Sequence, residues 1–151
     1  MTEPSQSLQS TLFSTVSSVD RLGLYAEDGF RPKALTEFLD LTHADISHMT
    51  GVSKQSVRLD AAIPNEVREH LEQIGNVCNM VAQHFDGDAR KTALWFKTKN
   101  PMLGDIAPRD MVRFGRYDKL RRFVIGALTD QVLDDKAKRR RSHGELEAVA
   151  S

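Results

Sequence analysis

A sharp turn at Gly51, within the segment 42–60 (THADISHMTGVSKQSVRLD), is the feature that most constrains the fold. Ile46 and Met49 share one face of an expected short helix before this turn. Glycine adopts the left-handed backbone conformation without the steric cost of a β-carbon, so Gly51 can end that helix. Ser53 follows as a candidate N-cap for a second helix, because its hydroxyl can accept from free backbone N–H groups. The segment therefore predicts a helix-turn-helix.

The second of these helices has the composition of a DNA recognition helix. Val52 and Val57 can pack into the core, which leaves polar and basic side chains facing outward. Such groups at the start of a second helix are suited to contacting base edges in a major groove. An ordinary helical hairpin is the alternative interpretation of the same pattern. The predicted DNA-binding residues are Thr42, His43, Ser53, Lys54, Gln55, Ser56 and Arg58.

Apolar residues recur every three or four positions along most of the chain, and no segment shows sustained period-two alternation. We therefore predict an all-α protein, in which an N-terminal helix-turn-helix module is joined by a long helix to a small helical C-terminal domain. The long helix is expected from Pro64 to about His84. The expected division of the chain is a polar segment and helix (1–29), the helix-turn-helix (30–63), a helical partner-binding or oligomerisation domain (64–135) and a basic disordered tail (136–151).

Proline and glycine set the expected ends of the other helices. Proline suits the first position of a helix, and the residue before proline is pushed out of the helical region. Breaks are expected at Asp86-Gly87-Asp88, at the turn 100–104 and at Gly115. The remaining helices are predicted at about 8–24, 32–39, 89–97, 108–114 and 117–133.

Charge is unevenly spread along a chain whose formal net charge is zero. Residues 1–84 carry six basic against eleven acidic side chains, and residues 85–151 carry 15 against 10. DNA binding requires side chains that neutralise phosphate. We therefore expect any DNA affinity to depend on formation of a homodimer or on the basic second half.

The sequence offers little for catalysis. The five histidines lack the spacing of a metalloprotease motif, and no glycine-rich phosphate loop follows a predicted strand. His70 and His84 are expected to face solvent, and Cys78, the only cysteine, is expected in the core. No apolar run approaches the roughly 20 residues that span a bilayer, and the N-terminus lacks a secretory pattern. We expect no enzymatic activity, cofactor, metal or membrane contact, and a cytoplasmic location.

Two adjacent aromatic residues precede the turn at 100–104. Trp95 and Phe96 cannot point the same way on one helix, so one is expected in the core and the other near the surface. Buried aromatic and arginine side chains dominate the energetics of interfaces. Packing of both aromatics at a helix corner, with the turn merely joining two helices, is the alternative.

The segment 93–115 (ALWFKTKNPMLGDIAPRDMVRFG) resembles the core motif of the Xre/MbcA/ParS antitoxin toxin-binding domain. That motif has a tryptophan at a helix end, an Asn-Pro-x-Leu-Gly turn, a Ser/Thr-Pro helix start and a closing glycine. Ala107 stands where the family has serine or threonine. The resemblance covers roughly residues 30–130. The matching residues, in order, are Trp95, Asn100, Pro101, Leu103, Gly104, Pro108 and Gly115.

The resemblance implies an antitoxin that binds and neutralises a RES-domain toxin, an enzyme that degrades NAD, and that represses its own operon by binding operator DNA. It further implies a homodimer and a toxin–antitoxin hetero-oligomer. Two alternatives stay open: a stand-alone helix-turn-helix regulator whose C-terminal domain only oligomerises, and an interaction module that does not read DNA. Arg139–Arg141 are a candidate contact to an acidic toxin surface. The predicted partner-binding residues are Trp95, Phe96, Asn100, Pro101, Leu103, Gly104, Arg109, Arg113 and Arg116.

Overall fold

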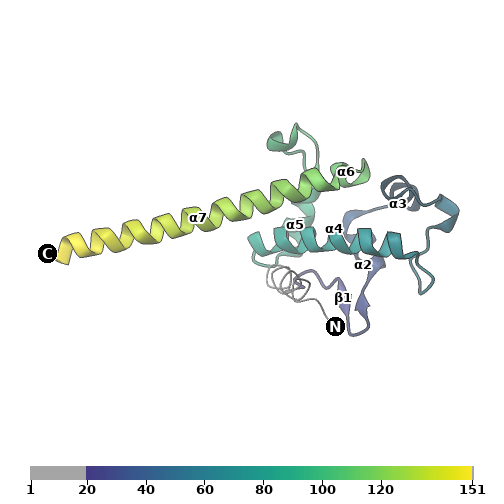
Figure 1. Ribbon diagram of the computed structural model, residues 1–151, viewed down its shortest axis with the longest axis horizontal. Coiled ribbons are helices and arrows are strands. Elements are labelled where there is room, and N and C mark those ends of the chain that lie inside the picture. The colour runs from purple at the N-terminus through teal and green to yellow at the C-terminus, as the bar shows by residue number, and fades with distance from the viewer. Residues whose placement is uncertain (1–19, 151) are drawn as a thin grey trace, which may run out of the picture.

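The computed structural model describes residues 20–150, and its long axis is set by one helix that projects from a helical body (Figure 1). This arrangement confirms the predicted all-α class, to which it adds one two-stranded hairpin. In chain order the elements are β1 (Tyr25–Ala26), β2 (Gly29–Phe30), α2 (Pro32–Leu39), α3 (His43–Thr50), the 3-10 turn η1 (Lys54–Ser56), α4 (Asn65–His84), α5 (Ala89–Lys97), the 3-10 turn η2 (Pro101–Leu103), α6 (Pro108–Arg113) and α7 (Tyr117–Ala150).

Helix α4 is the central element of the core, and it begins after Pro64 and ends at His84 as predicted. Its apolar positions recur at helical spacing and are fully buried, among them Val67, Leu71 and Ile74. It packs against α2, α3, α5 and α7. The segments expected as separate modules thus share one hydrophobic core.

Helix α3 has the best-defined ends in the first half of the body. The Thr42 hydroxyl accepts from the Asp45 backbone N–H, and the Asp45 carboxylate accepts from the Thr42 N–H, which forms a capping box. Gly51 ends the helix with a φ of 76°, as its predicted role requires. Ile46 is fully buried between these ends.

The prediction of a regular second helix in the helix-turn-helix is wrong. The chain after Gly51 forms only the three-residue turn η1, and the Ser53 hydroxyl bonds to the Ser56 hydroxyl at 2.9 Å instead of capping a helix. Val57 is buried, as expected, but it reaches the core from an extended backbone. A β-branched residue is compatible with that conformation, and its burial ends the turn. Residues 57–64 therefore form a connecting segment between η1 and α4.

The hairpin of β1 and β2 was not predicted. Tyr25 pairs with Phe30 and Ala26 with Gly29, around a two-residue loop. Residues 20–24, the end of the expected first helix, are not helical, and residues 8–19 of that helix lie outside the described part. Asn79 of α4 fixes residues 20–24 to the body, because its side-chain oxygen accepts from the N–H groups of Arg21 and Leu22.

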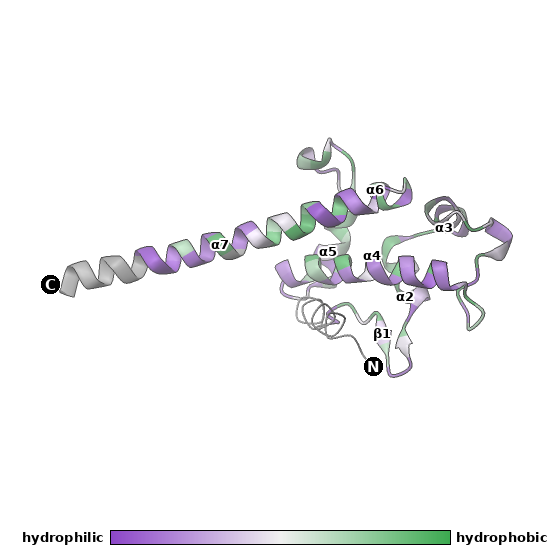
Figure 2. Ribbon diagram, viewed as in Figure 1, coloured by the Kyte–Doolittle hydropathy of each residue, from purple (hydrophilic) through white to green (hydrophobic). Residues whose placement is uncertain are grey.

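The C-terminal half departs from prediction only at its end. Helices α5, α6 and the start of α7 lie where expected, but α7 continues to Ala150, so the predicted disordered tail at 136–150 is helical. Alanine, lysine, arginine and glutamate, which dominate this stretch, all favour helix. Figure 2 shows the projecting turns before the grey end of α7 as mostly hydrophilic, with some apolar residues nearer the body. None of the helices in the described range is long and apolar enough to cross a membrane.

Candidate partner-binding site

The turn η2 is fixed by the side chain and backbone of Asn100. Its Oδ1 accepts from the Met102 N–H at 3.0 Å, and its carbonyl oxygen accepts from the N–H groups of Leu103 and Asp105. Its own N–H donates to the carbonyl of Ile106 at 3.2 Å. Pro101 supplies the first position of the turn, and Gly104 ends it with a φ of 78°. These bonds hold the turn in one shape, and Leu103 is buried beneath it.

The two adjacent aromatic residues divide as predicted. Phe96 is fully buried, with its ring edge-to-face against Phe38 of α2, whereas Trp95 is half-buried. The Trp95 ring lies 5.0 Å from that of Phe96, centre to centre. Phe96 is thus a core anchor, and Trp95 is the member of the pair that can reach a partner.

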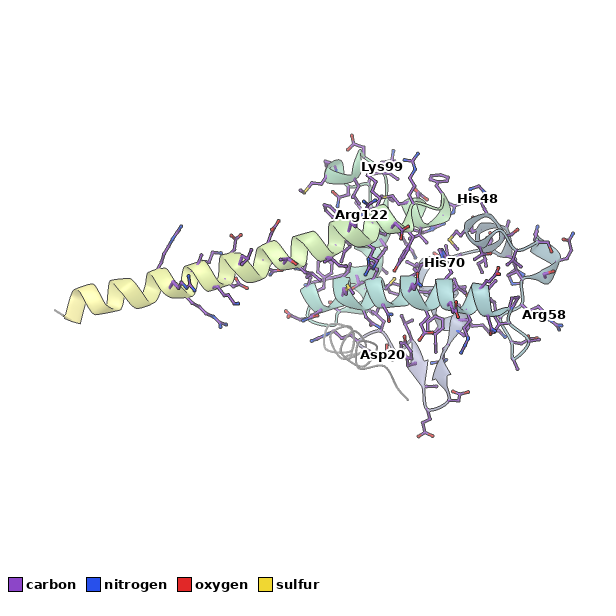
Figure 3. All side chains as sticks on the ribbon, in the orientation of Figure 1. Asp20, His48, Arg58, His70, Lys99 and Arg122 are labelled. Atoms are coloured by element: carbon purple, nitrogen blue, oxygen red, sulfur yellow. The ribbon has the colours of Figure 1, made fainter. Side chains whose placement is uncertain are left out.

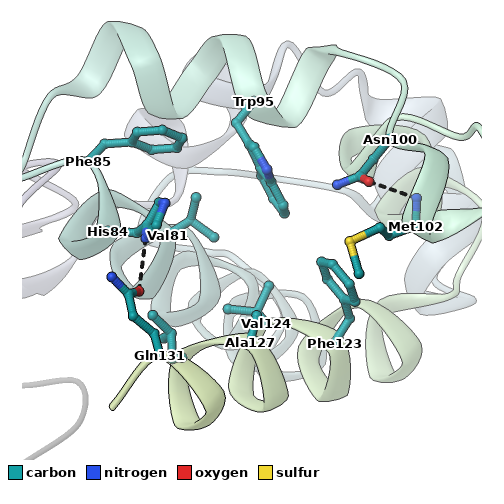
Figure 4. A pocket seen from close by; sticks show the side chains of 11 residues that line it. Val81, His84, Phe85, Trp95, Asn100, Met102, Phe123, Val124, Ala127 and Gln131 are labelled. Atoms are coloured by element: carbon teal, nitrogen blue, oxygen red, sulfur yellow. Dashed lines mark hydrogen bonds between the residues drawn. The ribbon is translucent and has the colours of Figure 1, made fainter. Parts of the chain in front are cut away.

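Trp95 forms one wall of an apolar hollow of about 240 Å³. Figure 4 shows the Trp95 ring, Phe123 and Met102 around the open space, with Phe85 and His84 at one end. The lining comes from α4, α5, η2 and α7 and consists of Val81, His84, Phe85, Trp95, Asn100, Met102, Phe123, Val124, Ala127, Leu128 and Gln131. We call this hollow the α5–α7 groove.

The α5–α7 groove is lined mostly by apolar side chains. The few polar groups sit at its ends: Asn100 is committed to its turn, and His84 Nδ1 is hydrogen bonded to Gln131 Oε1 at 3.1 Å. Two large apolar side chains, Leu94 of α5 and Met102 of η2, are 67% and 79% exposed. Met102 lines the hollow, and Leu94 is the sequence neighbour of Trp95. Exposed apolar side chains that form a patch are typical of an interaction site.

Two of the predicted partner-binding residues, Trp95 and Asn100, line the groove, and the residues on its opposite side were not predicted. Val81, Phe123 and Leu128 looked like ordinary core positions, since their spacing fits a buried stripe. Met102 occupies the variable position of the Asn-Pro-x-Leu-Gly turn. A large apolar residue at a turn position where the motif does not require one was the sequence feature that could have indicated an exposed contact at Met102.

The three arginines predicted as partner-binding have different environments. Arg113 donates to Asp45 Oδ1 and to Asp110 Oδ1, both at 3.1 Å, so its charge is used within the fold. Arg109 is half-buried, and its buried Nε has no hydrogen-bond partner among the described residues. Arg116 is exposed at the start of α7. Of these side chains, Arg116 is the most accessible to a partner.

The predicted DNA-binding residues are exposed, but several are used locally. Thr42 caps α3, Ser53 and Ser56 bond to each other, and Arg58 lies 3.6 Å from Asp60. His43, Lys54 and Gln55 are exposed. The stretch containing Arg58 lies at one end of the molecule, opposite the end to which α7 projects (Figure 3). Because η1 is a single 3-10 turn, residues 54–56 do not form a regular recognition helix that could enter a groove of DNA.

His70 of α4 was expected to face solvent and is instead half-buried. Its ring packs edge-to-face on Tyr117, and its Nε2 is buried with no partner among the residues described. Burial lowers the pKa of His70, and the nearby Asp118 carboxylate opposes that shift only in part. Burial likewise raises the pKa of Tyr117 to about 12.

The described residues hold no cluster of three or more His, Cys, Asp or Glu side chains that could bind a metal. Cys78 is fully buried in α4, and burial raises the pKa of its thiol far above the ordinary value. A protonated, inaccessible thiol is a packing group and a poor nucleophile. The expected place of Cys78 in the core is confirmed.

Comparison with known proteins yields one structural likeness. The chain is similar to a chain in the crystal structure of the M. tuberculosis MbcT–MbcA toxin–antitoxin complex, with 22% identity, 75% of this chain and 89% of that chain covered, and a TM-score of 0.41. At this identity and TM-score the likeness assigns neither fold nor function. No protein-family model matches the chain. No curated protein matches it.

Proposed function

We propose that this chain is the antitoxin of a toxin–antitoxin pair, and that it neutralises a RES-domain, NAD-degrading toxin by docking the α5–α7 groove on it. The observation that carries the proposal is the position of the antitoxin-like motif. Its tryptophan and its Asn-Pro-x-Leu-Gly turn supply one wall and one end of an apolar surface groove. A motif with no interaction role would not need Met102 in solvent.

The groove is suited to tight binding because its shape is already set. The hydrogen bonds of Asn100 fix the turn, and the core position of Phe96 fixes the helix that carries Trp95. A surface that is ordered before binding loses little conformational entropy when a partner docks. Aromatic side chains such as Trp95 are frequent hot spots of interfaces. The protein itself performs no chemistry in this proposal.

The test introduces acidic side chains on α5 and η2, the two elements that carry Trp95 and Met102, instead of truncating the chain. Deletion of residues 117–151 would remove Tyr117, Leu120 and Val124 from the core, so it would test folding and not binding. L94E and M102E alter side chains that are mostly in solvent, so the fold should persist. Each places a charge where an apolar contact is expected.

The measurement is co-expression with a RES-domain toxin encoded beside the gene for this chain, with cell growth and cellular NAD as readouts. The unaltered protein should restore growth, and L94E with M102E should fail to do so. The control is A61E with A62E, which adds the same two charges on an exposed turn between η1 and α4. Full rescue by the double variant, or the absence of any toxin that the protein binds, would overturn the proposal.

The proposal includes repression of the operon through operator DNA and a homodimer that presents two DNA contacts. Paired contacts raise the effective concentration of the second, which matters for a chain with no net charge. Sedimentation equilibrium at micromolar concentration should give twice the monomer mass. A gel shift with the operon's upstream DNA tests repression directly. A monomer that binds operator tightly would exclude the dimer.

The alternative, a stand-alone helix-turn-helix regulator, loses support because the chain forms only the three-residue turn η1 where the recognition helix was expected. It predicts operator binding with no toxin partner. Binding of a toxin in the co-expression experiment therefore separates the two functions.

A further inference from the structure

We infer that the basic stretch 136–141 of α7 is a binding element for duplex DNA, seated in a groove of the double helix and held by phosphate contacts. This inference deepens the DNA-binding part of the proposed function and is independent of toxin neutralisation. The stretch reads KAKRRR, with five cationic side chains in six residues and no acidic residue. All six residues are exposed.

The cations surround the helix. Successive residues of an α-helix are rotated by about 100°, so Lys136, Lys138, Arg139, Arg140 and Arg141 leave no sector of the circumference wider than about 100° without a positive charge. A helix that lies on a flat acidic surface needs charge on one face only. A helix in the major groove, which is about 12 Å wide, has phosphates on both sides. The distribution favours DNA over an acidic protein surface.

The position of the stretch separates it from the acidic half of the chain. Gln131, through its bond to His84, is the last residue of α7 for which the described part records a contact with the body. Arg139–Arg141 lie about 12–15 Å further along the helix axis, at 1.5 Å per residue. That separation exceeds the Debye length of about 8 Å at physiological salt. The acidic side chains of the body therefore repel DNA phosphates bound at Arg139–Arg141 only weakly.

Neighbouring acids do not remove the charge. Asp134 and Asp135 precede Lys138 and Arg139 by four residues, a spacing that permits ion pairs on a helix. None of the ion pairs between described residues involves these four side chains. By contrast, Arg58 beside η1 does have an acidic neighbour, Asp60. Within the described residues, the densest cluster of positive charge is therefore on α7, at the end of the molecule opposite η1 (Figures 1 and 3).

The test is fluorescence anisotropy of the full-length protein with a labelled 30-base-pair duplex of mixed sequence, at several salt concentrations. The test variant replaces the five cations of 136–141 with glutamine, which has a similar helix propensity. The matched control replaces five exposed cations elsewhere (Arg90, Lys91, Lys99, Lys119 and Arg122) with glutamine, so the net charge is the same. A third variant, K54A with Q55A and R58A, tests η1. Circular dichroism checks that each variant is folded.

The unaltered protein should bind with an affinity that falls steeply with salt. The α7 variant should lose at least about tenfold in affinity at low salt, and its log–log salt slope should shrink by up to about 4.5, near 0.9 for each of five lost phosphate contacts. The control should lose less than about threefold. Equal losses in the α7 variant and the control, or a loss confined to the η1 variant, would overturn the inference while leaving DNA binding intact. Absence of any binding by the unaltered protein would overturn both the inference about α7 and DNA binding by this chain. Stronger binding to polyglutamate than to duplex DNA would also overturn the inference.

Discussion

Arg113 Nε donates to Asp45 Oδ1 at 3.1 Å, and this ion pair joins two helix ends that are 68 positions apart in sequence. Asp45 also closes the capping box of α3 with Thr42. Burial raises the pKa of the Asp45 carboxyl, but the hydrogen bonds from Thr42 and Arg113 outweigh burial and hold that pKa below its ordinary value. The pair therefore stabilises the packing of α3 against α6 while the carboxyl is ionised.

Replacement of Arg113 should destabilise the protein more than replacement of a surface arginine. We expect R113A to lower the free energy of unfolding by about 1 kcal/mol, because Asp45 is mostly buried and loses a charged donor. The matched control is R58A, whose pair with Asp60 is exposed and should contribute less than about 0.5 kcal/mol. Urea unfolding at pH 7 measures both. Equal effects would show that the Asp45 pair is no more than a surface contact.

The same pair predicts a response to acid. The pKa of Asp45 is lower in the folded than in the unfolded state, so its contribution is complete above the unfolded value, near 4, and is lost as the pH falls through the folded value. R113A should lose less stability than the unaltered protein between about pH 4.5 and pH 2.5. Denaturant midpoints across that range are the measurement. Parallel curves for the two proteins would contradict this assignment.

Two glycines in helices should respond in opposite ways to alanine. A β-carbon at Gly126 of α7 meets nothing within 4 Å, so G126A should stabilise the protein by about 0.5–1 kcal/mol through helix propensity. A β-carbon at Gly75 of α4 would lie 3.2 Å from Leu24 Cδ1 and 3.2 Å from Phe30 Cε2. Crowding by the hairpin should cancel the gain, so G75A should be no more stable than the unaltered protein. Thermal melts that rank G75A above G126A would contradict the packing of β1 and β2 on α4.

Local signals in the sequence predicted those parts of the fold that proline, glycine and helical periodicity control. Helix α5 begins after Asp88, whose side chain caps it, and the turn at Asn100 and Pro101 was predicted from its residues alone. The hairpin escaped prediction because strands of two residues cannot show alternation. The prediction of a regular helix directly after Gly51 was wrong. Val57 is buried from an extended backbone, and this packing overrides a polar pattern that is compatible with helix.

The candidate site divides in the same way. One wall follows from a contiguous motif, so the sequence predicted it. The other walls come from α4 and α7, and only tertiary packing brings Val81 and Phe123 beside Trp95. A periodic apolar stripe does not reveal which of its members lie at the edge of the core, so the groove itself could not be predicted.

His70 gives the last prediction, a stability that falls as the pH is lowered from 7.5 to 5.5. Burial lowers the pKa of His70 in the folded state, so the unfolded chain binds more protons in this range and stability must fall on acidification, by at most about 1.4 kcal/mol per pH unit. H70F keeps an aromatic ring against Tyr117 and cannot titrate, so its unfolding free energy should depend less on pH. H48Q removes an exposed imidazole from α3 and serves as the control. Asp45 stays ionised at these pH values, which isolates the effect of the histidine. Urea midpoints at four pH values measure the slopes, and an H70F slope equal to that of the unaltered protein would show that His70 is hydrated in the folded state.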